Sequence, residues 1–165
     1  MDTVFFKTLY AYNDWANMQV LETASMLGEA EYRRDFGLAW GSVHGTLAHL
    51  LAADHLWFAR WNGTSPQSRP VGAEYATLAD IRADWTPFMA ERRSYIEGLT
   101  GDDLVRVIDY KTTQGEASSQ PLWWGLYQVV SHGTDHRSHL SIMLTELGHP
   151  TVPLDFIAFV RLKNG

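Results

Sequence analysis

The chain has 165 residues, of which 45% are hydrophobic, and it carries a net charge of -6 with no cysteine. This length and apolar content predict a single folded domain over residues 1–165 and exclude a disordered chain. The acidic balance argues against a nucleic-acid partner, because phosphate backbones attract basic surfaces. The lack of cysteine excludes disulfides, thiolate metal ligands and cysteine nucleophiles.

The first seven residues lack the basic segment and apolar core of a signal peptide. No apolar run approaches the roughly 20 residues that are needed to span a bilayer. We therefore expect a cytoplasmic protein without a membrane partner.

Apolar residues recur at helical spacing in four long segments, and start and stop signals flank these segments. Ser42 and Thr77 are suitable N-caps for the second and third segments, and Pro121 suits the first turn of the fourth. Gly28 and Gly148 are suitable stops after the first and fourth segments. The expected helices cover residues 3–27, 42–61, 77–99 and 121–147.

The regions around these helices predict one β-hairpin and several loops. Residues 105–110 are rich in Val and Ile and predict a short strand, which residues 113–115 would turn back into a partner ending near Gln120. Pro87 should kink or divide the third helix. Residues 29–40 and 67–76 are expected to be loops, residues 101–103 a turn, and the apolar tail residues Phe156, Ile157, Phe159 and Val160 should pack against the helices.

These elements predict an all-α fold, a four-helix bundle with a crossover connection and a short β-hairpin before the last long helix. Within that last helix, three histidines lie in eight positions: His132, His136 and His139. At about 100° per residue they form a narrow stripe. Nearby Gly125 and Val129 indicate that the stripe faces inward.

Imidazoles on an inward face need partners, because an unpaired buried polar group costs roughly 1–3 kcal/mol. Hydrogen bonds in the core or at the surface are one solution, and a metal ion is the other. His49 on the second helix is the best candidate for a third ligand, since Gly45, Ala52 and Ala53 would leave room for an ion and its ligand. The other histidines, His44, His55 and His149, are expected to be surface, capping or loop residues.

Two common metal-site patterns are excluded. A di-iron bundle requires inward carboxylates and two Glu-x-x-His pairs, whereas residues 146–149 form the one such pair and straddle the expected stop at Gly148. The His-Glu-x-x-His motif of zincins is absent. The predicted site is mononuclear and histidine-rich, and imidazole ligands suit Zn, Ni, Fe, Mn and Co alike.

Residues 12–17, 42–49 and 132–139, in this order and at these distances, resemble the DinB/YfiT-like superfamily of metal-dependent helical proteins. The resemblance covers nearly the whole chain. It implies a helical bundle, often dimeric, with one divalent metal ion held by three histidines. Many relatives have glutamine at the position of His139, which leaves its role open between a metal neighbour, an extra ligand and a substrate contact. By position, the ligands are His49, His132 and His136.

Characterised relatives are thiol-dependent transferases and isomerases that use low-molecular-weight thiols such as bacillithiol or mycothiol. The resemblance therefore implies a homodimeric, metal-dependent enzyme, a thiol S-transferase or a related hydrolase or isomerase, with a small-molecule substrate. A chain without cysteine would take the thiolate from its cofactor or substrate. The alternatives are a non-catalytic, metal-binding stress-response dimer and a helical interaction module.

Several other residues have two interpretations each. Arg137 could hold an anionic group or form an ion pair between helices. Asp54 could orient an imidazole from behind or be a solvated carboxylate. The tryptophans Trp57, Trp123 and Trp124 could line a pocket or belong to the core.

Overall fold

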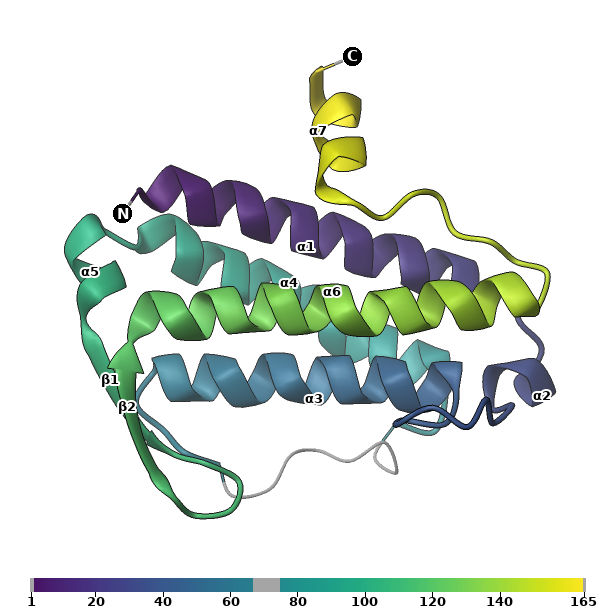
Figure 1. Cartoon of the computed structure of the whole chain (residues 1–165), viewed down its shortest axis with the longest axis horizontal. Coiled ribbons are helices and arrows are strands. Elements are labelled where there is room, and N and C mark those ends of the chain that lie inside the picture. Colours follow the sequence, from purple (N-terminus) through teal and green to yellow (C-terminus); the bar gives the residue numbers. More distant parts are fainter. Residues whose placement is uncertain (1, 67–74, 165) are drawn as a thin grey trace.

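The computed structural model describes residues 2–66 and 75–164 (Figure 1). Four long helices lie along its longest axis: α1 (Thr3–Ala24), α3 (Val43–Trp61), α4 (Leu78–Gly98) and α6 (Leu122–Glu146). The described part also has three short helices and two strands. These are α2 (Glu29–Tyr32), α5 (Gly101–Val105), α7 (Phe156–Asn164), β1 (Val107–Lys111) and β2 (Ala117–Pro121).

The predicted helical fold, with a hairpin before the last long helix, is confirmed. Strands β1 and β2 pair antiparallel, with Val107 opposite Pro121 and Lys111 opposite Ala117. Helices α1 and α6 run in one direction and α3 and α4 in the opposite one (Figure 1). The end of α3 and the start of α4 therefore lie at opposite ends of the molecule, as the predicted crossover requires. Residues 67–74 of the predicted loop lie outside the described residues.

Side-chain caps start α3 and α4 at the predicted positions. The Ser42 hydroxyl accepts a hydrogen bond from the Gly45 amide at 3.0 Å. The Thr77 hydroxyl accepts from the Asp80 amide at 3.2 Å, and the Asp80 carboxylate accepts from the Thr77 amide at 2.8 Å. Caps of this kind stabilise a helix by about 1 kcal/mol each. His49 is among the buried residues of α3.

Helix α4 continues through Pro87 and is not divided. The missing proline amide leaves the carbonyl of Ala83 without its helical partner. Both residues are exposed, so that water can hydrogen-bond to the carbonyl.

Several boundaries differ from those predicted. Helix α1 ends at Ala24, and Gly28 is the N-cap of α2, within the predicted loop. Residues 101–103 are the first turn of α5, which Thr100 caps by accepting from the Asp103 amide at 3.3 Å. Helices of four or five residues are too short to show a helical repeat of apolar residues, so the sequence does not indicate them.

A buried polar layer separates two apolar clusters, one around Leu51 and Trp85 and the other around Trp61 and Leu126. On α4, for example, the polar residue Arg92 lies between Met89 of the first cluster and Ile96 of the second. The layer therefore crosses the middle of the bundle.

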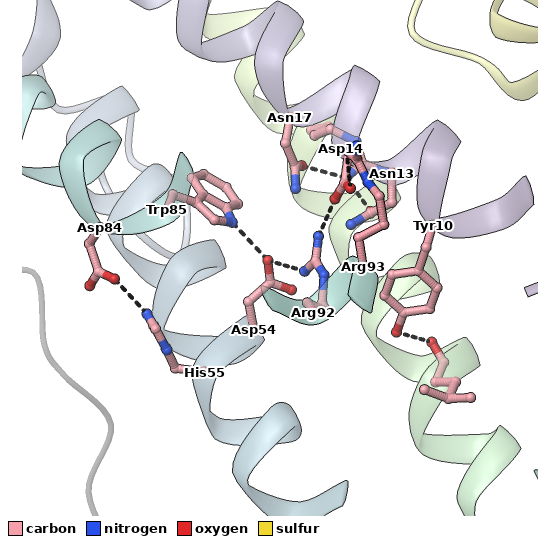
Figure 2. A network of polar contacts seen from close by, with 12 residues as sticks. Tyr10, Asn13, Asp14, Asn17, Asp54, His55, Asp84, Trp85, Arg92 and Arg93 are labelled. Carbon is pink, nitrogen blue, oxygen red and sulfur yellow. Dashed lines mark hydrogen bonds and ion pairs between the residues drawn. The ribbon is translucent and has the colours of Figure 1, made fainter. Parts of the chain in front are cut away.

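Arg92 is fully buried at the centre of this layer and forms ion pairs with Asp14 of α1 and Asp54 of α3 (Figure 2). The Trp85 indole donates to Asp54 at 2.8 Å, and Arg93 donates to Asp14 at 3.0 Å. Burial lowers the pKa of Arg92, but the two carboxylates outweigh it and raise the pKa above its usual range. The described contacts of Asp54 therefore go to α4 and not to an imidazole.

Helix α7 projects from the bundle and contacts α1 (Figure 1). Phe159 is buried, with its ring centroid 6.0 Å from that of Tyr12, and Val160 is half-buried. Phe156 also meets the Tyr12 ring but stays 40% exposed, and Ile157 is 53% exposed. The expected packing of the tail thus holds for Phe159 and Val160 and is wrong for Ile157, because one face of this short helix points outward.

Within residues 2–66 and 75–164, no helix combines the length and the apolar content that crossing a membrane requires.

Candidate metal centre

Three histidines converge between α3 and α6. The Nε2 atom of His132 lies 3.1 Å from Nε2 of His49 and 3.1 Å from Nε2 of His136. Each of the three residues offers a ring nitrogen within 4.8 Å of the other two. Helix α6 supplies His132 and His136 one turn apart, and α3 supplies His49. The structure therefore brings together the three histidines that the sequence selects as candidate ligands.

The contacts of His132 Nε2 suit a shared cation better than a pair of hydrogen bonds. An imidazole nitrogen carries either one proton or one lone pair in the ring plane, which supports one good hydrogen bond. His132 Nε2 nevertheless has two nitrogen neighbours at equal distance. Nitrogens at about 2.0–2.1 Å from a tetrahedral zinc ion stand about 3.3 Å apart, close to the observed separations. The donor set thus fits one divalent ion with open coordination positions.

Burial favours the neutral, metal-binding form of His136. His49 and His136 are buried, and His132 is half-buried. Burial lowers the pKa of His136, the Asp135 carboxylate raises it by less, and His139 adds to the lowering. An imidazole must be unprotonated to bind a metal, so this pKa shift keeps His136 available as a ligand at neutral pH.

A tryptophan that the sequence does not indicate covers His49, the candidate ligand on α3. The Trp40 ring stacks on His49 with centroids 3.7 Å apart and planes 13° from parallel. A Cβ atom at Gly45 would lie 2.1 Å from the Trp40 carbonyl oxygen. The space beside Gly45 therefore holds the backbone of Trp40, and the expectation that it leaves room for an ion is wrong. Trp40 lies in an irregular segment before α3, where no periodic pattern marks it.

Two of the remaining histidines pair with residues elsewhere. The His44 ring contacts the Tyr75 carbonyl oxygen at 2.7 Å, and the His55 ring contacts Asp84 at 3.0 Å. Both link α3 to the region of α4, and neither belongs to the three-histidine cluster. His149 follows the end of α6 and is half-buried.

His139 lies beside the cluster, one turn beyond His136, with ring centroids 5.7 Å apart. One nitrogen each from His136 and His139 and an oxygen of Asp135 lie within 4.8 Å of one another. This second group shares His136 with the first, and Asp135 is exposed. His139 is therefore placed as a neighbour of the three-histidine cluster.

Arg137 points toward α1. Its Nη1 atom donates to the amide oxygens of Asn13 and Asn17, both at 2.7 Å, and Nη2 donates to the Thr134 hydroxyl at 3.1 Å. A Cβ atom at Gly133 would lie 2.8 Å from Arg137 Nη1 and 3.0 Å from the side-chain oxygen of Asn13, so the glycine makes room for this contact between α6 and α1. Arg137 thus links α1 and α6, but through neutral partners and not through the expected ion pair.

The tryptophans divide between core and surface. Trp57 and Trp123 are half-buried against the second apolar cluster, whereas Trp124 is 51% exposed. Trp57 and Trp123 therefore pack against the core.

The fold and the cluster define a class: helical bundles in which histidines from two long helices meet at one point. The chain belongs to the DinB family, whose family model matches residues 1–164. It is 24% identical over 153 residues to Protein DinB of Bacillus subtilis (strain 168), an alignment that covers 90% of this chain and 89% of that protein. The resemblance inferred from the sequence motifs is confirmed.

The fold is also similar to the crystal structure of a DinB-like protein from Bacillus cereus ATCC 10987. The TM-score is 0.59, with 14% identity, over 85% of this chain and 92% of that chain. At this level of identity the likeness concerns the fold alone.

Proposed function

We propose that this protein is a metal-dependent enzyme that holds one divalent ion with His49, His132 and His136 and acts on a small molecule together with a low-molecular-weight thiol. The two 3.1 Å contacts of His132 Nε2 carry the proposal, because they place three imidazole nitrogens around one point. Membership of the DinB family supports it. Zn, Ni, Fe and Mn all suit this donor set.

A bound divalent ion supplies a Lewis acid, which lowers the pKa of a thiol or water in one of its open positions. The chain contributes three uncharged imidazoles as ligands. They do not offset the positive charge of the divalent ion. It has no cysteine, so the thiolate comes from a cosubstrate. His132 is half-buried and Trp40 is 40% exposed, which puts the centre near the surface, within reach of a small thiol.

The proposed reaction class is thiol S-transfer or a related hydrolysis or isomerisation. A cytoplasmic location fits this class, because thiols stay reduced there. The proposed assembly is a homodimer, without a nucleic-acid or membrane partner.

The first test is the metal content of the protein purified without a histidine tag. We expect about one divalent ion per chain, and its loss in each of His49→Ala, His132→Ala and His136→Ala. His149→Ala removes a histidine outside the cluster and should retain the metal. Unchanged metal content in all three cluster variants would refute the proposed site.

The second test measures thiol consumption by the metal-loaded protein with a panel of electrophiles. Bacillithiol, mycothiol and glutathione are the thiols to compare. Consumption that depends on the three histidines would support the enzyme. A protein that binds metal and consumes none of these thiols would instead be the non-catalytic metal-binding protein.

A further inference from the structure

A cavity of about 370 Å³ lies between α1, α6 and the segment that precedes α7. Its lining includes Tyr12 from α1, Arg137 and Ser141 from α6, and Leu154 and Asp155 from the segment before α7. The three clustered histidines are not among the lining residues. The volume falls within the range of sites for small molecules.

Arg137, which lines this cavity, is 2% exposed. It donates hydrogen bonds to the neutral oxygens of Asn13, Asn17 and Thr134, and the neutral Tyr12 side chain also interacts with its guanidinium. Its Nε atom is buried and has no hydrogen-bond partner within residues 2–66 and 75–164. The Nε–H group of Arg137 is thus left unsatisfied by the described residues of the bundle.

Arg137 also has no ion pair with the buried acids of the bundle, although Asp54 interacts favourably with its charge at longer range. Asp14 and Asp54 form their ion pairs with Arg92, and Arg137 forms none with a described carboxylate. Arginine stays protonated in proteins, and a buried charge without a counter-charge is unfavourable. The planar guanidinium edge matches the two oxygens of a carboxylate or a phosphate.

We infer that this cavity binds the carboxylate or phosphate group of a small molecule, with Arg137 as the residue that holds the anion. Asp155 narrows the choice of ligand. Its exposed carboxylate lines the same cavity and accepts from the Ala158 amide at 3.0 Å at the start of α7. A ligand with one oxyanion toward Arg137 and a hydrogen-bond donor toward Asp155 therefore fits the lining best.

The test follows the Nε–H signal of Arg137 by two-dimensional nitrogen–proton NMR of the full chain. Sodium acetate and inorganic phosphate are titrated separately at constant ionic strength. We expect a saturable shift of this one arginine signal, and the anion with the higher affinity identifies the ligand as a carboxylate or a phosphate. No saturable shift with either anion would overturn the inference.

Two variants change the charge of the cavity while leaving Arg137 in place. Ile142 lines the cavity and is 54% exposed, so Ile142→Glu adds a negative charge without disturbing the core. We expect it to weaken anion binding at least threefold relative to the matched control Ile142→Gln, and Asp155→Asn to strengthen binding while keeping an acceptor for Ala158. Equal affinities in the Glu and Gln variants would show that the anion binds elsewhere.

Discussion

Trp40 lies flat against His49 and limits the rotation of a candidate metal ligand. Groups that orient a ligand from behind typically contribute 10–100-fold to metal affinity. We therefore expect Trp40→Ala to weaken Zn²⁺ or Ni²⁺ binding by about 10-fold, as measured by calorimetry on the apoprotein. Trp124→Ala is the matched control, because it removes an exposed tryptophan that contacts Trp123 instead. Equal losses of affinity in both variants would contradict a positioning role for Trp40.

The segment before α3 leaves no room for a side chain at position 45, so this position requires glycine. In an exposed helix, alanine is about 1 kcal/mol more favourable than glycine. At this position the added Cβ would lie 2.1 Å from a backbone oxygen, so Trp40 would have to move. We expect Gly45→Ala to lower the free energy of unfolding by roughly 1–3 kcal/mol in urea titrations. Gly98→Ala adds a Cβ with nothing within 4 Å and should leave stability unchanged or raised.

Helices α1, α3 and α4 are joined by the ion pairs of Arg92. Removing one partner of a buried pair leaves the other charge uncompensated, which costs about 3–5 kcal/mol. We expect Arg92→Met to lose stability in this range in chemical unfolding. The triple variant Asp14→Asn, Asp54→Asn, Arg92→Met removes all three charges and should be more stable than the single variant. A triple variant less stable than Arg92→Met would mean that Arg92 does not compensate the buried charges of Asp14 and Asp54.

The features that could be predicted from the sequence depend on local spacing. The starts of α3 and α4 follow from Ser42 and Thr77, whose side chains cap residues three positions away. The proximity of His132 and His136 is likewise predictable, because the two residues lie one turn apart on the same helix. Arg92 meets Asp14 across 78 positions, and no repeat along the chain connects the two. The stack of Trp40 on His49 depends on the path of an irregular segment, which side-chain periodicity does not describe.

The whole bundle should respond to metal, because His49 belongs to α3 and the other two candidate ligands belong to α6. An ion that binds the folded chain alone stabilises it by about 2.7 kcal/mol at a free concentration of 100 times Kd. We expect the melting temperature to rise with added Zn²⁺ or Ni²⁺ and to fall again with a chelator. His132→Ala should abolish the shift, and a melting temperature insensitive to both metals would contradict a site that joins α3 to α6.

The separation of the histidines also affects how the protein is made. His49 and His132 are 83 positions apart, so a ribosome synthesises α4 and the hairpin before the second candidate ligand exists. His132 and His136 then arrive together on α6. A chain released before α6 holds one histidine of the three and cannot assemble the cluster. Metal binding would therefore distinguish chains that contain α6 from chains truncated before it, because α6 supplies two of the three histidines.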